Sequence, residues 1–562
     1  MKLKNKHLYW IFALLAATSF DILFWERPFG INFFIFILLA VLGGLIPTWM
    51  EKIHVPWTSY LLLVPLAFFS VMTFIRVEPF TTAVNVLVTL SALAFFLMTL
   101  RNGTWFRYSL RDIFVSGIQF LLNNVIGGIL FFNKTKKAES SQVGEADNAN
   151  DNAKVEGKQD QESHGENLGK KEKPLKGIAP YLRGLLLALP VLGILTFFLA
   201  QADPIFNDRI RNALAWFRIE NLGEMVFRLV YILVIAYVLL SSYYFAVVES
   251  KKYQPDDDNE KLAISPFLGS IESSVILGAV NLLFLLFVVL QFNYLFSGGK
   301  NISLQGYTYA EYARRGFFEL IAVAVISLVL FYILSMITKR EQKNQGRLFS
   351  ALGLILVGLV AIILTSAYIR LNLYEAAYGF TRLRTLAHVF MIWIALLLAG
   401  VAILEITRTM KRLAFILILF IVGFGLTINL LNTDQFIVNQ NISRAINNHN
   451  DRAESDLDTG YLYSLSADAV PSLVEFYTDG NTPDNVRAEI GGVLACKFAQ
   501  IDVPQDESWV SYHYSRSQAN TLLAQQSKNL DAYPVSYDMY TWFVEVNGEV
   551  KSCSGYQADP YD

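Results

Sequence analysis

The sequence predicts an all-α polytopic membrane protein with about eleven transmembrane helices, followed by a small, mainly helical soluble domain that contains a β-hairpin. Two observations support this fold class. Hydrophobic residues make up 54% of the 562 residues and charged residues only 17%, and the mean hydropathy is +0.39. Soluble proteins are typically about 45–50% apolar and about 25% charged. The apolar residues also form long uninterrupted runs, which is the pattern of membrane-spanning helices.

Each apolar run of roughly 18 or more residues is long enough to cross a bilayer, because about 20 helical residues span a hydrocarbon core of ~30 Å. The runs lie near residues 8–25, 29–50, 55–75, 80–100, 181–200, 229–248, 271–296, 317–337, 348–369, 386–406 and 413–431. The first run follows the basic stretch MKLKNKH, as in a signal peptide, but no small-residue cleavage pattern leads into a polar chain. We therefore expect a retained helix.

The lysines and arginines of the short loops predict the orientation, because they favour the cytoplasmic side. An N-terminus inside places Lys2, Lys4 and Lys6 in the cytoplasm and leaves only Arg27 and Arg76 in the first two outer loops. With eleven spans the C-terminus then lies outside. We expect this topology in the cytoplasmic membrane of a bacterial cell. Later outer loops carry more arginines, and these need a separate explanation.

The composition divides the chain into five parts. Residues 1–100 are expected to form a four-helix transmembrane unit, 101–132 an interfacial amphipathic segment, 133–176 a disordered cytoplasmic linker, 177–431 a seven-helix core and 432–562 an acidic extracytoplasmic domain. The linker has almost no large apolar residue, so it cannot bury enough surface to become ordered. The alternative for residues 112–132 is a further span, which would invert the side of everything downstream.

The C-terminal region has its own signals. Residues 432–562 hold 19 Asp and Glu against 7 Lys and Arg. We expect helices in DAVPSLVEFYTD, NVRAEIGGVLACKFA and SQANTLLAQQSKN, and a hairpin around Asn547-Gly548, the favoured two-residue turn. Cys496 and Cys553 are the only cysteines, and both lie here. An extracytoplasmic location favours a disulfide between them; the alternative is two free thiols.

The stretch TYAEYARRGFFEL, residues 308–320, places an organised polar segment at the edge of an apolar run. Thr308 and Glu311 have the spacing of a capping box, so we expect one helix from Tyr309 into the span. Arg315 lies four residues from both Glu311 and Glu319, on one helix face. Glu319 then lies about one turn inside the apolar region, where an ionisable group indicates a functional site. The alternative is simple neutralisation by a snorkelling Arg315.

We therefore predict a polar network at the outer ends of the spans, in which arginines pair with acids. Arg382 and Arg384 are expected to pair with Glu319 or Asp203. The candidate residues are Asp203, Glu311, Arg314, Arg315, Glu319, Glu375, Arg382 and Arg384.

Several stretches together resemble a bacterial family of polytopic membrane proteins of unknown function. They are ADPIF at 202–206, QFNYLFSGG at 291–299, TYAEYARRGFFEL at 308–320, YGFTRLRTLAHVFMIW at 378–393 and YLYSLSADAVPSLVEF at 461–476. The resemblance covers roughly residues 180–480. It implies a multi-pass core followed by a soluble helical tail, and it transfers no catalytic or binding residues to this chain.

The sequence lacks the motifs of common enzymes: there is no Walker A loop, no GxSxG and no HExxH. We assign no catalytic residue, no metal site and no cofactor, and the charge balance gives no sign of nucleic-acid binding. The expected function is non-enzymatic sensing or scaffolding, with the lipid bilayer and a protein at the extracytoplasmic domain as partners. The alternatives are a transporter of a small solute or ion, and a membrane enzyme acting on lipid or cell-envelope precursors at the outer face.

Overall fold

The structure is a computed structural model of the full chain. It describes residues 6–125, 127, 222–251, 266–295, 317–340, 343–448, 457–501, 509–538 and 540–553, with scattered residues between 188 and 209. The chain forms two compact units, one made of Met1–Gly128 and Ala236–Asp562 and the other of Ile129–Ile235. The expected linker at 133–176 lies outside the described residues, and so does most of the expected span at 181–200.

Ten of the eleven expected apolar runs form helices in the described part of the chain, and the fold class is confirmed. Among the described residues, ten helical segments are long and apolar enough to cross a membrane. They are α1 (Lys6–Phe24), α2 (Ile31–Met50), α3 (Trp57–Tyr60) with α4 (Leu63–Ile75), α5 (Pro79–Thr99), α9 (Leu222–Tyr244) with the π-helix η2 (Phe245–Glu249), α10 (Ser270–Leu295), α12 (Phe317–Ile337), α13 (Lys343–Tyr378), α14 (Arg382–Ile406), and η4 (Met410–Arg412) with α15 (Leu413–Leu431).

A further helix occupies residues 110–125, after the short 3₁₀-helix η1 (Trp105–Arg107). It packs beside the last part of α9. Asn123 donates a hydrogen bond to the carbonyl of Ser241 (2.9 Å), and the Ser242 hydroxyl donates to Asn124 Oδ1 (2.9 Å). The two asparagines that interrupt this apolar stretch therefore bind a neighbouring helix. An interfacial position for this segment remains a prediction.

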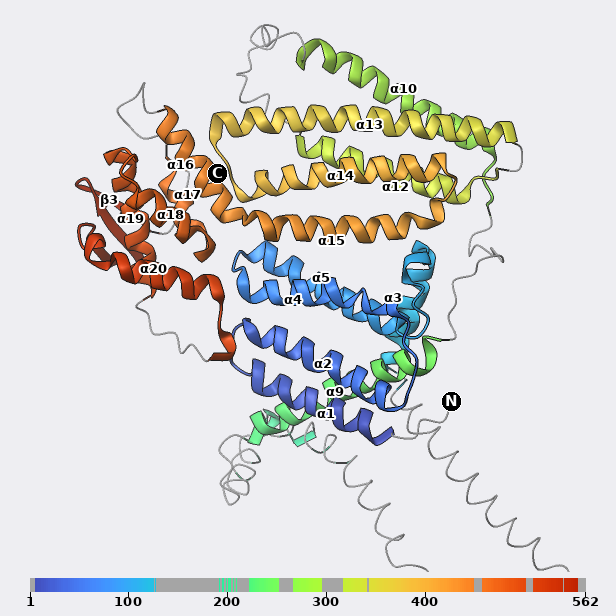
Figure 1. Ribbon diagram of the computed structural model, residues 1–562, viewed down its shortest axis with the longest axis horizontal. Helices are drawn as coiled ribbons and strands as arrows, with labels where there is room; N and C mark the ends of the chain where they lie inside the picture. The colour runs from blue at the N-terminus through green and yellow to red at the C-terminus, as the bar shows by residue number, and fades with distance from the viewer. Residues whose placement is uncertain are drawn as a thin grey trace, which may run out of the picture. The chain divides into compact units, whose positions relative to one another are not determined.

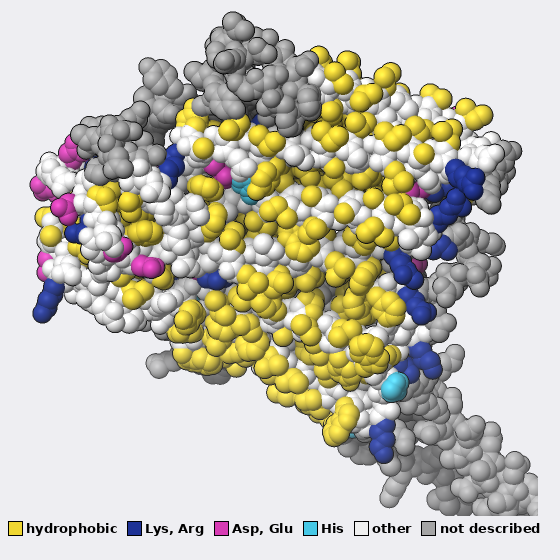
Figure 2. Space-filling view, turned by 45° about the horizontal axis from the view of Figure 1, so that its top comes forward, with side chains coloured by type: hydrophobic (Ala, Val, Ile, Leu, Met, Phe, Trp, Pro, Cys, Tyr) yellow, Lys and Arg dark blue, Asp and Glu magenta, His cyan; other side chains and the backbone are white. Residues whose placement is uncertain are grey.

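Successive described helices of the larger unit alternate in direction, so their loops gather at two ends (Figure 1). The domain end, which contacts the C-terminal domain, has the loops at 25–30, 76–78 and 379–381. The basic end has the loops at 51–56, 100–109 and 407–412. Figure 2 shows Lys and Arg side chains gathered at the basic end and Asp and Glu side chains on the C-terminal domain.

Small residues and amides hold the helices together. The ring of Tyr243 lies against Gly43 and Gly44, where an added Cβ would come within 2.8 Å and 3.1 Å of it, and its hydroxyl donates to the Ala40 carbonyl. Close contact at small residues is a common way for membrane helices to associate. The buried amides of Asn85 and Asn429 join α5 to α15 by hydrogen bonds in both directions, at 3.0 and 2.6 Å.

The C-terminal domain, residues 433–553, has its own hydrophobic core. Its helices are α16 (Thr433–Asn448), α17 (Thr459–Ser464), η6 (Ala467–Ala469), α18 (Val470–Thr478), α19 (Asp484–Ile501), η7 (Trp509–Ser511) and α20 (Tyr514–Leu530). The core is built around α19, whose buried face includes Val486, Ile490, Val493 and Leu494. Three of these helices match the three expected from the sequence.

An antiparallel three-stranded sheet covers one side of α19. Its strands β1 (Val535–Asp538), β2 (Thr541–Val546) and β3 (Glu549–Ser552) lie in the order β1-β2-β3. The β2–β3 turn is at Asn547-Gly548, where both residues have positive φ (52° and 81°), as a type I′ turn requires. A Cβ on Gly492 would lie 2.4 Å from Val546, so only glycine lets the helix approach the sheet this closely.

Candidate functional site

The most extensive polar cluster lies where the C-terminal domain meets the domain end of the spans. At its centre Arg382, the first residue of α14, binds Asp434 of α16 with two parallel hydrogen bonds, Nε–Oδ1 at 2.7 Å and Nη2–Oδ2 at 2.6 Å. The Asp434 carboxylate is fully buried and also accepts the Ser466 backbone N–H (2.7 Å). A bidentate, charge-assisted pair of this kind is among the stronger polar contacts in proteins.

Asp468 makes a second connection, to the loop between α4 and α5. One oxygen of its buried carboxylate accepts the backbone N–H groups of Val77 (2.9 Å) and Glu78 (3.1 Å). Arg76 lies 3.8 Å from the other oxygen, which is also in close contact with the Ser515 hydroxyl oxygen. Asp468 therefore fixes the start of α5 to the domain through three partners, Arg76, Val77 and Glu78.

Glu78 links these two parts of the cluster. Its buried carboxylate caps α5 by accepting the backbone N–H groups of Phe80 (3.1 Å) and Thr81 (2.6 Å). A negative group at a helix N-terminus is favourable because of the helix dipole. Its Oε1 also lies 3.9 Å from Arg382 Nε. We call Arg76, Glu78, Arg382, Asp434 and Asp468 the ionic junction.

Glu375 lies outside this junction, in the last turn of α13. It is buried, and its Oε1 lies 3.1 Å from Nδ1 of His388 on α14. The His388 ring also packs edge-on against Tyr368 (4.7 Å between centroids), and its buried Nε2 has no hydrogen-bond partner among the residues that the structure describes. Ionisable groups within spans are costly unless they are paired, and such a pair is therefore a candidate functional site.

Arg384 caps a helix rather than binding a carboxylate in the contacts described. Its Nη1 donates to the carbonyls of Tyr378 and Gly379 at the C-terminal end of α13, and its guanidinium lies 3.9 Å from the centroid of the Tyr374 ring. A cation at this position complements the helix dipole.

The other predicted site residues are not among the described contacts of the junction. Glu319 is exposed in the first turn of α12. Asp203 is exposed and belongs to the smaller unit, residues 129–235. Glu311, Arg314 and Arg315 lie outside the described residues, as does the expected start of their helix at Tyr309. The acids that bind Arg382 are Asp434 and Glu78, which the sequence reading did not select.

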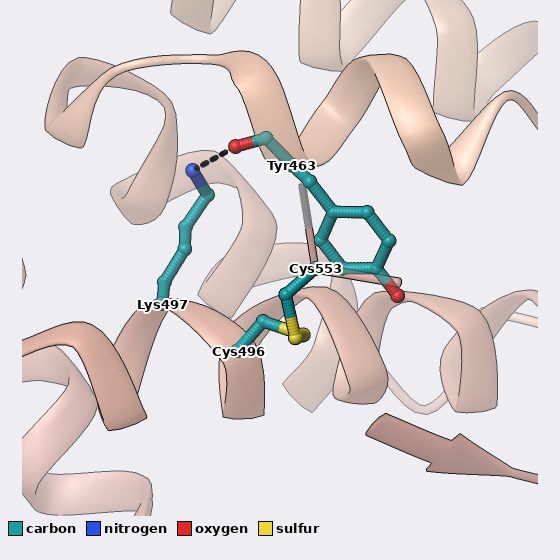
Figure 3. Close-up of a disulfide and its surroundings, with 4 residues drawn as sticks. All are labelled: Tyr463, Cys496, Lys497 and Cys553. Atoms are coloured by element: carbon teal, nitrogen blue, oxygen red, sulfur yellow. Dashed lines mark hydrogen bonds between the residues drawn. A yellow bond between two sulfur atoms is a disulfide. The ribbon is translucent and has the colours of Figure 1, made fainter. Parts of the chain in front are cut away.

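Cys496 of α19 and Cys553, just after β3, form a disulfide across the domain (Figure 3). Both are buried. The adjacent Lys497 is also buried, and its Nζ donates to the carbonyls of Tyr463 (3.2 Å) and Leu465 (2.6 Å). Burial lowers the pKa of Lys497 to about 8, an effect that the negative charge of Asp434 partly opposes. The bridge and this lysine connect α19 to the sheet and to the segment after α17.

Local signals for two of the missed acids are present in the sequence. Glu78 directly precedes Pro79, the first residue of α5, which is the position of an N-cap before a helix-starting proline. Ser466 and Asp468 precede Pro471 and the apolar part of α18. Neither pattern identifies the partner. Among the described residues, no group of three or more His, Cys, Asp or Glu side chains is placed to hold a metal ion.

One comparison with known proteins gives a match. The model of a family described as "Domain of unknown function (DUF4153)" matches residues 63–476. The match begins in the third span, well before the region near residue 180 where the sequence resemblance begins, and it ends within α18. No curated protein and no solved structure matches the chain.

Proposed function

The chain belongs to the DUF4153 family and has the architecture of a multi-pass membrane protein, and from this premise we propose that it senses or scaffolds through its C-terminal domain without catalysing a reaction. The observation that supports this is the ionic junction. Its three buried carboxylates, Glu78, Asp434 and Asp468, are satisfied by protein groups, so the junction is a mechanical connection rather than an open ligand site. A partner bound to the domain would act directly on α5 and α14.

We also propose that the C-terminal domain lies outside the cytoplasm and the N-terminus inside. The basic end of the helices carries most of the Lys and Arg side chains of the described loops (Figure 2), and such residues favour the cytoplasm. The disulfide in the C-terminal domain supports an oxidising compartment. The charge distribution and the disulfide thus both favour an outer location for the C-terminal domain.

Thiol labelling in intact cells tests this orientation. Both native cysteines are bonded, so an introduced cysteine is the only free thiol. Tyr540 lies in the turn between β1 and β2 and is 95% exposed, so Tyr540→Cys should react with a membrane-impermeant maleimide. Thr407→Cys, exposed at the basic end, should react only after lysis. The reverse pattern would place the domain inside and contradict the proposal.

Photo-crosslinking tests the scaffolding function. A photoreactive amino acid at Tyr540, exposed in the β1–β2 turn, or at Val550, exposed on β3, should form discrete protein adducts in native membranes. The matched control is Ile355, an exposed residue within α13, which should form lipid adducts. If positions 540 and 550 gave no protein adduct above the control, the domain would not be a docking surface.

The second candidate function is transport of an ion or small solute coupled to protons. The Glu375–His388 pair within α13 and α14 favours it, because the buried Nε2 of His388 has no partner among the described residues. The purified chain would be reconstituted into vesicles loaded with a pH-sensitive dye. Proton entry along an imposed gradient that is lost in Glu375→Gln would support transport, and no flux above empty vesicles would count against it.

A further inference from the structure

The segment 509–515, from η7 into the first turn of α20, has a buried side and an exposed side. Val510, Ser511, His513 and Ser515 are buried. Trp509, Tyr512 and Tyr514 are exposed, and Trp509 retains 71% of its accessible surface. Three large aromatic side chains therefore project from a short segment whose other face is fixed. We call these three residues the aromatic face.

The buried face fixes the segment to the ends of two spans. The backbone N–H of Ile31, the first residue of α2, donates to the Tyr512 carbonyl at 3.1 Å. The Ser515 hydroxyl donates to the carbonyl of Ile75, the last residue of α4, at 2.6 Å. At Gly30 an added Cβ would lie 2.6 Å from the Ser511 carbonyl group, so the two backbones are in direct contact.

These contacts determine the depth of the aromatic face relative to the bilayer. Ile31 begins a 20-residue span with a mean hydropathy of 2.3, and Ile75 ends a 19-residue span with a mean hydropathy of 1.9. Both residues therefore mark the edge of the hydrocarbon layer. A segment in hydrogen-bond contact with them lies at the level where headgroups meet acyl chains.

Trp and Tyr side chains are enriched at this level of membrane proteins, because their rings are apolar and their N–H and O–H groups remain hydrated. The segments that precede α2 also expose apolar side chains. Phe29, next to Gly30, is exposed, and Ile22 is exposed near the end of α1. Such a surface on a chain with apolar spans is expected to contact lipid.

We propose that Trp509, Tyr512 and Tyr514 insert into the interfacial layer of the phospholipid bilayer and hold the C-terminal domain on the membrane surface. This surface is separate from the sheet, where a protein partner is proposed. The aromatic face contacts the headgroups and the upper part of the acyl chains of the lipids. The proposal requires that α2 and α4 span the membrane. It does not require that the C-terminal domain lie on a particular side of the membrane or that the protein have a sensing role.

Spin labelling of the full chain in phospholipid vesicles tests the proposal. Cysteines replace Trp509, Tyr512 and Tyr514 one at a time, and each is labelled with a nitroxide while the native cysteines remain bonded. Oxygen concentrates in the bilayer, and a nickel chelate stays in water. At each position we would measure the rate at which the nitroxide collides with oxygen and the rate at which it collides with the nickel chelate. The ratio of the first rate to the second should be several-fold higher at these positions than at Tyr540→Cys, in the β1–β2 turn.

Two outcomes would overturn the proposal. A ratio equal to that of Tyr540→Cys would place the aromatic face in water. Low accessibility to both reagents would mean that protein, such as a second copy of the chain, covers it. Three positions are tested separately, so the loss of one variant through misfolding leaves the others, and protection of the disulfide from reductant reports whether each labelled domain is folded.

Discussion

Arg382 and Asp434 form a bidentate ion pair between the first residue of α14 and the first turn of α16, with two hydrogen bonds of 2.7 and 2.6 Å. The pair connects a span directly to the C-terminal domain. Asp434 is fully buried, and Arg382 is the cation that is hydrogen-bonded to it. Removing one partner of a buried pair is far more costly than removing both.

Arg382→Leu should therefore detach α16 from the end of α14. We expect a loss of about 3–5 kcal/mol, the usual cost of a buried carboxylate without its partner. Hydrogen–deuterium exchange should become faster in residues 433–448 and 461–466. The double variant Arg382→Leu/Asp434→Asn removes both charges and should recover most of the protection. Equal exchange in the single variant and the wild type would show that the junction does not hold the domain.

For the Asn85–Asn429 pair within the spans, removing one amide should likewise cost more stability than removing both. Asn85→Leu leaves the Asn429 amide without one partner, although its bond to the Gly425 carbonyl remains (2.8 Å). We expect a loss of about 1–2 kcal/mol, and a smaller loss for Asn85→Leu/Asn429→Leu. A double-mutant cycle on thermal unfolding in detergent measures this coupling. Additive losses would mean that the two amides do not interact.

Lys497 predicts a rise in stability at alkaline pH. Burial lowers its folded-state pKa to about 8, from 10.5 in the unfolded chain. Between these values the unfolded chain binds more protons, so the free energy of unfolding should increase with pH, by about 3 kcal/mol over the full window. The midpoint of thermal unfolding should rise between pH 8 and 10. Lys497→Met should lack this increase, and an identical pH profile in both proteins would exclude Lys497 as its source.

The disulfide should contribute strongly to the stability of the C-terminal domain. Cys496 and Cys553 are 57 residues apart, and a loop of this length corresponds to about 4 kcal/mol in the chain-entropy account. Cys496→Ala/Cys553→Ala should therefore unfold at a lower temperature than the wild type. Reductant should lower the wild-type midpoint to that of the variant and leave the variant unchanged. A reductant effect on the variant would indicate another cause.

The helices were predictable because their signal is local. Each run of apolar residues specifies its own span, and Asn547-Gly548 specifies its own turn. The strand β1 was missed because its four residues, VSYD, carry too short a pattern to be recognised. It exists because β2 pairs with it in antiparallel register, with Val535 opposite Val544. That pairing is a property of the folded domain.

The ionic junction was only partly predictable, for a related reason. The outer arginines indicated that acids must lie nearby. However, Asp434 is 52 residues away from Arg382, and Asp468 is 390 residues away from the Glu78 N–H that it accepts. The clue was the acidic excess of the C-terminal region, with 19 acids against 7 bases. That excess lies opposite the span ends where Arg76 and Arg382 are located. The charge totals indicated that the acidic domain and the arginine-bearing span ends attract each other. The individual ion pairs could be identified only from the folded structure.

The Asn85–Asn429 bond also limits how the chain can be made. The two residues are 344 positions apart, so at about 5–20 residues per second α5 enters the membrane roughly 20–70 s before α15 is synthesised. During that interval the Asn85 amide has no native partner in the bilayer, where an unpaired polar group is costly. We therefore expect the first four spans to remain beside the insertion machinery, or to bind other polar groups temporarily, until the last span is released.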